Sequence, residues 1–303
     1  MVRSSYRGND VAVLRGNLGI ADFMIELIQI FIIAVAQGIS EFLPISSSGH
    51  NAVIDHLFDR FGHPLTDDSI EFIRLNILLH VGSLVAILIV FRQRIVDMFG
   101  KDRRLIPMLI VAAIPVGMIG VVIKMFYPDI QTSLPLISGC FVITGLLLLY
   151  TLRLPEGGKT ISTMTWKDAI IIGCAQVLAI LPGISRSGTT IVAALLCRLK
   201  REDAAAFSFI LAIPVIVGSG LWECYDMIRD APESNADSIS IGLLLVGVLV
   251  SCVAGILALV FLLDWLKKGK LWYFAIWVFV MSLITLTLAI LPMTVGNEPN
   301  TPS

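Results

Sequence analysis

Long apolar stretches with almost no charged residues are the feature that most restricts how this chain can fold. Six of them are long enough to cross a bilayer, and they lie at about 75–91, 105–123, 134–152, 204–222, 239–263 and 271–293. At about 1.5 Å of rise per residue, roughly 20 apolar residues in a helix span the hydrocarbon core. Charged residues make up only 15% of the chain, whereas a soluble domain has roughly a quarter. The sequence therefore predicts an all-α polytopic membrane protein with six transmembrane helices.

Two further apolar regions, 24–60 and 169–199, are interrupted by Pro, Ser and Gly. Each holds a short apolar helix, a break, and a second short helix. We expect neither short helix to cross the bilayer alone. Because irregular backbone is tolerated at membrane depth only where protein or a water-filled cavity surrounds it, each region is predicted to be a re-entrant helical hairpin.

The two broken regions resemble each other. AQGISEFLPISSSGH at 36–50 aligns with AQVLAILPGISRSGTT at 175–190, and Ala-Gln, Ile-Ser and Ser-Gly recur at a constant offset of 139 residues. Each hairpin precedes three spans, an odd number, so the two halves must have opposite orientations, as in an inverted-topology repeat. The predicted organisation is an N-terminal extension, a first repeat, a cytoplasmic linker, a second repeat and a disordered tail, at 1–23, 24–152, 153–168, 169–293 and 294–303.

The distribution of basic residues predicts the orientation. The loops at 92–104, 153–168, 198–203 and 264–270 hold 5, 3, 3 and 3 Lys and Arg, whereas those at 55–74, 124–133 and 223–238 hold 2, 1 and 1. Basic loops stay in the cytoplasm, so the first set is predicted to be cytoplasmic. The first hairpin then enters from outside and the second from the cytoplasm. The net charge of −1 and the lack of a basic tract give no indication of nucleic-acid binding.

Polar residues gather at the two interruptions, where their burial in a membrane is costly and favours a function. Gln37 and Glu41 are one helical turn apart and share a face. Helix starts with exposed N–H groups, several hydroxyls and one guanidinium together form an anion site, and phosphate fits it best. A single Ser or Thr here is more often a helix cap than a catalyst. The combination of Glu41, His50 and Arg186 is harder to explain by packing.

The two motifs carry a family resemblance. QGISEFLPISSSGH and PGISRSGTT resemble the signature motifs of bacterial undecaprenyl pyrophosphate phosphatases, the bacitracin-resistance protein family, and the resemblance extends over about residues 24–290. It implies removal of the terminal phosphate from undecaprenyl pyrophosphate, which recycles the carrier lipid for peptidoglycan synthesis, and a role in bacitracin resistance. It also implies a location in the bacterial inner membrane, a site open to the periplasmic side, and a divalent cation, Mg²⁺ or Ca²⁺.

The resemblance and the residue chemistry together predict the site. The expected catalytic residues are Glu41, Ser47, His50 and Arg186, with Glu41 also the metal ligand. The expected substrate-binding residues are Gln37, Ser46, Ser48, Ser185, Ser187, Gly188 and Thr190. Many relatives have Glu where this chain has Gln37, which puts a cation bridged by two carboxylates in doubt. The nucleophile is left open among Ser47, His50 and a water activated by Glu41.

Several alternatives are compatible with parts of the pattern. An inverted repeat with broken helices is also a transporter architecture, so the alternative function is a transporter or lipid flippase. A second superfamily of membrane phosphatases needs a later nucleophilic His, but all four His lie before residue 81. The G-x-S-x-G elbow of serine hydrolases is absent, because Ser187 follows where Gly is required. Membrane lipids are expected neighbours, and a homodimer is one alternative for the oligomeric state.

Overall fold

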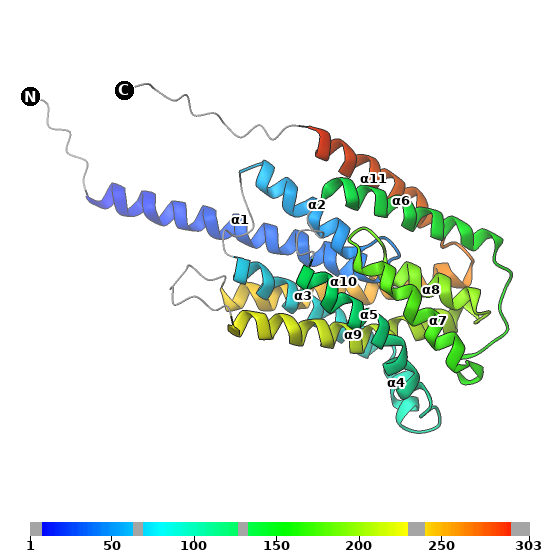
Figure 1. Ribbon diagram of the computed structural model, residues 1–303. Coiled ribbons are helices and arrows are strands. Elements are labelled where there is room, and N and C mark those ends of the chain that lie inside the picture. Colours follow the sequence, from blue (N-terminus) through cyan, green and yellow to red (C-terminus); the bar gives the residue numbers. More distant parts are fainter. Residues whose placement is uncertain (1–7, 63–68, 127–132, 230–239, 292–303) are drawn as a thin grey trace, which may run out of the picture.

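The computed structural model describes residues 8–62, 69–126, 133–229 and 240–291. This part of the chain is helical (Figure 1). Its α-helices are α1 Gly8–Phe42, α2 Ser47–Arg60, α3 Ser69–Val90, α4 Arg92–Phe99, α5 Leu105–Phe126, α6 Leu134–Tyr150, α7 Trp166–Gln176, α8 Arg186–Leu196, α9 Arg201–Arg229, α10 Ile241–Lys267 and α11 Tyr273–Ile290. Three short 3₁₀ turns at Thr151–Arg153, Ile161–Thr163 and Val177–Ile180 connect them.

Six helical segments of the described chain are long and apolar enough to cross a membrane. They are Phe23–Phe42, Leu105–Ile123, Leu134–Arg153, Arg201–Asp226, Ile241–Lys267 and Tyr273–Ile290. Five of these confirm predicted spans. The remaining prediction, 75–91, corresponds to the Leu75–Val90 segment of α3. This segment is followed by α4, Arg92–Phe99, and the two meet at a bend of 74°. Counting that bent pair as one span raises the total to seven.

The first broken region differs from the prediction in its first half. Residues 24–42 do not form a short helix. They belong to α1, whose segment Phe23–Phe42 alone is 20 residues long. Nothing in the sequence breaks the helix between the expected extension at 1–23 and this segment, so helical hydrogen bonding continues through the predicted boundary. The second half, α2, is 14 residues long and folds back along α1 (Figure 1). The expected tail, 294–303, lies outside the described residues.

Helix α10 packs against both α1 and α3, and small residues allow the close approach. A Cβ added at Gly38 of α1 would lie 2.4 Å from the Ser251 carbonyl oxygen, and one at Gly82 of α3 would lie 2.5 Å from that of Val248. Membrane helices associate largely through such small-residue contacts, because lipid offers little hydrophobic driving force between helices. On the other side, α11 pairs with α6, and α5 packs on α7.

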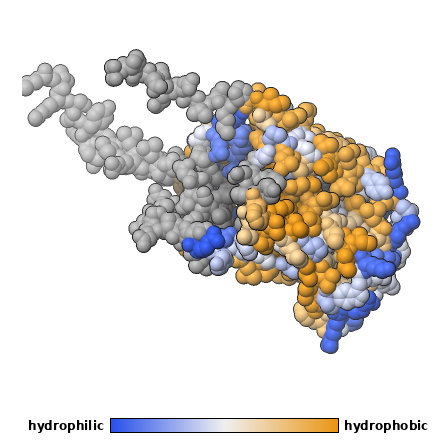
Figure 2. Space-filling view, viewed as in Figure 1, coloured by the Kyte–Doolittle hydropathy of each residue, from blue (hydrophilic) through white to orange (hydrophobic). Residues whose placement is uncertain are grey.

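The outer surface is apolar. Leu245, Leu257 and Met118 are each about two-thirds exposed, at 64%, 67% and 66%. In Figure 2 hydrophobic side chains cover the middle of the visible face, and hydrophilic ones gather at its right-hand end and around α4. This distribution fits a multi-pass protein whose sides face lipid and whose ends face water.

The connection between α6 and α7 contacts both ends of the second broken region, which comprises α7 and α8. The Lys159 amide donates to the Arg198 carbonyl oxygen just after α8, at 3.0 Å. Its ammonium pairs with Asp168 in the first turn of α7, also at 3.0 Å. Burial raises the pKa of Asp168, but hydrogen bonds from Thr165 and Lys159 outweigh it and hold that pKa below its ordinary value. The start of α7 and the end of α8 therefore lie at the same end of the molecule.

The four basic loops meet at this end. The Arg104 guanidinium donates to the Met164 carbonyl oxygen at 3.2 Å, which joins the loop at 92–104 to the one at 153–168. Lys267 pairs with Glu202 at 3.4 Å, which joins the loop at 264–270 to the one at 198–203. Because all four loops share one end, the structure agrees with the grouping that the basic-residue counts indicated.

Candidate active site

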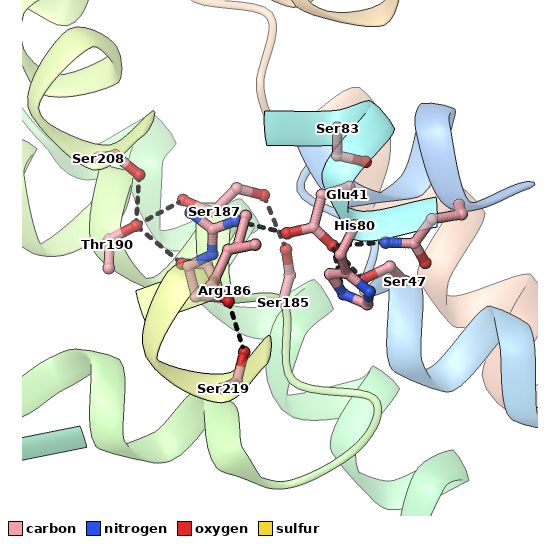
Figure 3. A network of polar contacts seen from close by, with 12 residues as sticks. Glu41, Ser47, His80, Ser83, Ser185, Arg186, Ser187, Thr190, Ser208 and Ser219 are labelled. Carbon is pink, nitrogen blue, oxygen red and sulfur yellow. Dashed lines mark hydrogen bonds and ion pairs between the residues drawn. The ribbon is translucent and has the colours of Figure 1, made fainter. Parts of the chain in front are cut away.

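The two interruptions, far apart in the sequence, meet inside the molecule. The Gly183 amide donates to Ser46 Oγ at 3.1 Å, and Ser187 Oγ donates to the Leu43 carbonyl oxygen at 3.2 Å. Between these contacts the Arg186 guanidinium pairs with a Glu41 carboxylate oxygen at 2.5 Å. The loop after α1 and the loop before α8 thus form one polar centre (Figure 3).

The two loops share the same pattern of capping hydrogen bonds, although the backbone of the first cap, Ser46, has φ of +72° and that of the second, Ser185, has φ of −70°. Ser46 caps α2 by accepting from the Gly49 amide at 3.4 Å, and Ser185 caps α8 by accepting from the Gly188 amide at 3.1 Å. Both caps also contact the hydroxyl two residues later, in Ser48 and Ser187, at 3.3 and 3.2 Å. Ser46 and Ser185 are therefore helix caps, and each cap orients the amide N–H groups of its helix start toward the centre.

Two glycines allow the loops to touch. Gly183 has φ of +93°, and a Cβ there would lie 2.5 Å from the Ile137 carbonyl oxygen. A Cβ at Gly49 would lie 2.7 Å from the Phe141 ring and 3.0 Å from Gly183 Cα. Only glycine adopts such a backbone conformation without strain and leaves this space.

Gly183→Ala should therefore lower the thermal stability of the purified protein. The backbone strain alone costs about 1–3 kcal/mol, and the clash with Ile137 adds to it. The melting temperature in detergent is the measurement. Gly120→Ala in α5 is the matched control, because a Cβ there meets nothing within 4 Å and alanine favours helix. Equal melting temperatures for the two variants would contradict the proposed close contact.

The Glu41 carboxylate contacts four other side chains of the polar centre. One carboxylate oxygen pairs with Arg186. The other accepts from Ser47 Oγ at 2.7 Å and from the Gln37 amide at 3.2 Å, and it lies 3.9 Å from His80 Nε2. Glu41 is only 8% exposed, so these partners replace water around its charge.

Arg186 has unused hydrogen-bonding capacity. Its Nη2 pairs with Glu41, but its Nη1 is buried and has no acceptor among the described residues. A buried guanidinium N–H without an acceptor is costly, and a planar guanidinium is suited to binding two oxygens of one phosphate. Arg186 can thus hold Glu41 and an anion at the same time.

Two other predicted residues, His50 and Thr190, form hydrogen bonds with partners other than Glu41 and the Arg186 guanidinium. His50 lies at the start of α2, where its Nδ1 contacts the Ser46 carbonyl oxygen at 2.7 Å and its Nε2 accepts from the Trp277 indole at 2.8 Å. Thr190 Oγ1 donates to the Arg186 carbonyl oxygen at 2.8 Å and shares a short hydrogen bond with Ser208. The Thr190 hydroxyl thus contacts backbone carbonyl groups in the first turn of α8, and no contact with the Arg186 guanidinium is seen. Their functional roles remain predictions.

Sequence reasoning missed three members of the centre. His80 comes from α3, Trp277 from α11, and Asn51 donates to the Gln37 amide oxygen at 2.7 Å. For His80 a signal existed, since it is an ionisable residue inside a predicted span and directly precedes Val-Gly-Ser, which recurs at 217–219. Trp277 and Asn51 had no comparable signal.

The donor set does not form a resident cation site with two carboxylates. No group of three or more His, Cys, Asp and Glu that would hold a metal occurs in the described part of the chain. Glu41 is already ion-paired, and the neighbouring position is the amide of Gln37. These donors fit instead a hard cation such as Mg²⁺ that takes one protein carboxylate and completes its shell with phosphate oxygens and water.

These features define a polytopic helical membrane protein with a buried polar centre between two broken helical regions. The chain belongs to the family described as Bacitracin resistance protein BacA, whose model matches residues 30–284. It is 40% identical over 266 residues to an undecaprenyl-diphosphatase of Rhodopirellula baltica, covering 88% of this chain and 99% of that one. It is 38% identical to one of Carboxydothermus hydrogenoformans, covering 86% and 96%, and 35% identical to one of Halothermothrix orenii, covering 87% and 98%.

Proposed function

We propose that this chain is a membrane phosphatase that hydrolyses undecaprenyl pyrophosphate to undecaprenyl phosphate and inorganic phosphate. The single observation that carries the proposal is the Glu41–Arg186 pair, which joins the two sequence motifs at 2.5 Å and leaves one buried guanidinium nitrogen without an acceptor among the described residues. A diphosphate head group supplies the acceptors that this nitrogen lacks. Recycling of the carrier lipid would serve peptidoglycan synthesis, and the family to which the chain belongs supports a role in bacitracin resistance.

Arg186 and the first turn of α8 bind the terminal phosphate in this mechanism. Amide N–H groups at a helix start and a fixed guanidinium stabilise anions there. During phosphoryl transfer, charge spreads over the three equatorial oxygens, and donors already oriented toward them stabilise that charge without reorganisation. Burial of Ser187 and Gly188 in the same turn excludes water, which strengthens these interactions.

Ser47 is the nucleophile that the geometry supports best. Its hydroxyl already donates to Glu41 at 2.7 Å, which is the nucleophile–base arrangement that activates a hydroxyl. Both ring nitrogens of His50 have partners, in Ser46 and Trp277, so attack by His50 would require breaking one of these contacts. Water activated by Glu41 is then the nucleophile of the second step, which releases inorganic phosphate.

We also propose that a divalent cation, Mg²⁺ or Ca²⁺, acts together with the substrate. Glu41 is the carboxylate that would hold it, and the cation would neutralise charge on the phosphates. Gln37 makes this chain poorer in negative charge than a relative with two carboxylates.

Gln37→Glu should therefore lower the cation concentration that gives half-maximal activity, on the order of tenfold, because affinity rises with the number of charged ligands. The measurement is phosphate release against Mg²⁺ or Ca²⁺ concentration after EDTA treatment. Asn51→Asp is the control, because it also adds one carboxylate to the centre. The Asn51 side chain contacts Gln37 and makes no hydrogen bond with Glu41. An unchanged cation requirement in Gln37→Glu would contradict the assignment of this position.

The topology completes the proposal. We infer that the chain turns back within the inner membrane after Phe42 and again before α8, as in the two hairpins of an inverted repeat, even though α1 is longer than the predicted short helix. In this arrangement the basic end lies in the cytoplasm and the site opens to the periplasm. Two observations support this inference. Lys159 contacts both the start of α7 and the residue pair just after the end of α8, so the second region begins and ends at the same end of the molecule. In the first region, α2 returns along α1. Labelling of single cysteines placed at residues 158 and 62 tests it, because the two should react from opposite membrane faces.

The decisive experiment compares phosphatase and transporter. The purified full-length chain in detergent should release inorganic phosphate from undecaprenyl pyrophosphate, and Glu41→Ala should abolish the release. Detergent micelles have no two sides, so a transporter or flippase would give no product. Absence of phosphate release from the unaltered chain would refute the proposed function.

A further inference from the structure

An apolar groove of about 360 Å³ lies between α5 and α9. Its walls are formed largely by glycines and aliphatic side chains, with Gly120 on α5, Gly218 on α9 and Ile180 of the 3₁₀ turn after α7 among them. The hydroxyl of Ser219, which also lines it, donates to the Ile216 carbonyl oxygen of its own helix at 3.1 Å. The groove has the size of a small-molecule pocket, and its walls suit a hydrocarbon ligand.

The groove lies in the second repeat where the first repeat has its polar residues. Gln176 aligns with Gln37 in the two related motifs, and Ile180 follows Gln176 by four residues as Glu41 follows Gln37. The helix after each hairpin, α3 or α9, carries the same Val-Gly-Ser sequence. Corresponding parts of the two repeats are therefore charged in one half and apolar in the other.

The two repeats also differ in how tightly their helices pack at Val-Gly-Ser. A Cβ added at Gly82 of α3 would lie 2.5 Å from the Val248 carbonyl oxygen of α10, so this place is closed. A Cβ added at Gly218 of α9, or at Gly120 of α5, would meet no atom of the described chain within 4 Å. Glycines in membrane helices usually let a second helix approach closely. Here they leave space between two helices instead.

The groove begins beside the polar centre. Helix α9 packs against α8, whose first residue is Arg186, and Thr190 one turn further on shares a hydrogen bond with Ser208 of α9. A short connection joins the two helices, so α9 returns past the start of α8. Figure 3 shows Ser219 on the same side of the centre as Arg186. From this level the groove continues along α9 to Trp222.

We propose that this groove holds the polyprenyl chain of the lipid substrate next to its diphosphate; this inference rests on the proposed phosphatase function. The chain is bonded to the diphosphate, so its path must begin where Arg186 binds the phosphates. Between Ala113 and Ile123 the groove follows α5 for about 15 Å. It therefore holds the first isoprene units and leaves the rest in the bilayer. The open glycine positions on both walls accommodate methyl branches, which a straight acyl chain lacks.

A second apolar depression, between α1 and α10, is the alternative path. Its lining includes Leu43 at one end and Leu257, which is 67% exposed. The helices beneath it are in contact, because a Cβ at Gly38 would lie 2.4 Å from the Ser251 carbonyl oxygen. It is thus a shallow depression over packed helices and not a gap between them, and it provides the matched control.

Substitutions that fill the groove test the inference in the full-length chain. Gly218→Leu and Gly120→Leu place a side chain in it from opposite walls, and the open space at both positions and the helix preference of leucine should preserve folding. One methylene of mismatch in an apolar pocket is worth about 10–200-fold, so KM for undecaprenyl pyrophosphate should rise about tenfold. The value of kcat should change little, because the reacting groups are untouched. Leu257→Trp should leave both constants unchanged.

Cysteine protection locates the chain without relying on turnover. In Gly218→Cys, undecaprenyl phosphate should slow the reaction with a maleimide several-fold, whereas inorganic pyrophosphate and an equal amount of a phospholipid should not. Leu257→Cys should show no protection. Peptide mass analysis separates these positions from the native cysteines, of which Cys174 is exposed.

Unchanged KM in both leucine variants of an active chain would overturn the inference and leave the proposed function intact. Equal protection by the phospholipid would also overturn it, because the groove would then be an ordinary lipid site. A raised KM in Leu257→Trp alone would place the chain between α1 and α10 and have the same consequence. If the unaltered chain releases no phosphate, the proposed function is refuted, and protection of Gly218→Cys still decides whether the groove holds a polyprenyl chain.

Discussion

Arg186→Ala should lower phosphate release from undecaprenyl pyrophosphate by about 10³–10⁵-fold, the range that a transition-state arginine contributes in phosphoryl transfer. The guanidinium is buried, pairs with Glu41 and has one nitrogen without an acceptor, so no neighbouring cation in the centre replaces it. Arg186→Lys should recover only part of the rate, because an ammonium keeps the charge but cannot bind Glu41 and phosphate in the same planar geometry. The measurement is kcat on purified protein.

Stability must be separated from catalysis in this variant. Arg186→Ala leaves the Glu41 carboxylate buried without its counter-ion, which costs about 3–5 kcal/mol when one partner of a buried pair is removed. The double variant Arg186→Ala/Glu41→Gln removes both charges and should recover most of the melting temperature but no activity. If the double variant is both stable and active, the pair is structural and the phosphate site lies elsewhere.

Ser47→Ala should reduce turnover by at least about 10³-fold, comparable to the loss of a nucleophile that acts together with its base. Its hydroxyl is the one that donates to the Glu41 oxygen nearest His80, and alanine removes the attacking oxygen with little change in volume. Folding should be preserved, because Ser46 and not Ser47 caps α2.

Ser48→Ala is the matched control for Ser47→Ala. Ser48 lies one residue further along, but its hydroxyl contacts Ser46 and not Glu41, so the loss of rate should be far smaller. Rapid quenching with substrate labelled in the terminal phosphate should trap label on the unaltered chain and not on Ser47→Ala. Near-normal turnover of Ser47→Ala would show that water attacks directly and that Ser47 only binds.

Much of the architecture was predictable because lipid imposes simple rules. Five of the six spans were predicted from apolar length, and the common end of the basic loops from Lys and Arg counts. The length of the first helix was predicted wrongly, because the apolar pattern weakens before residue 24 and suggested that the helix begins there. A helix needs only backbone hydrogen bonds to continue, so α1 runs through that change in polarity to Phe42. The bend after Val90 was also unseen, as no Pro or Gly marks it.

The sequence by itself determined which residues are polar where lipid should be, and that two similar motifs carry them. It also determined the helical class and the family resemblance, since these depend on composition and on local order along the chain. Only the tertiary structure decided that Glu41 meets Arg186, that His50 is bonded at both nitrogens, and that His80 faces the Ser47–Glu41 pair. Such contacts join residues 39 to 227 positions apart, and the packing of α3, α8 and α11 around the two loops, not any local pattern, sets those distances.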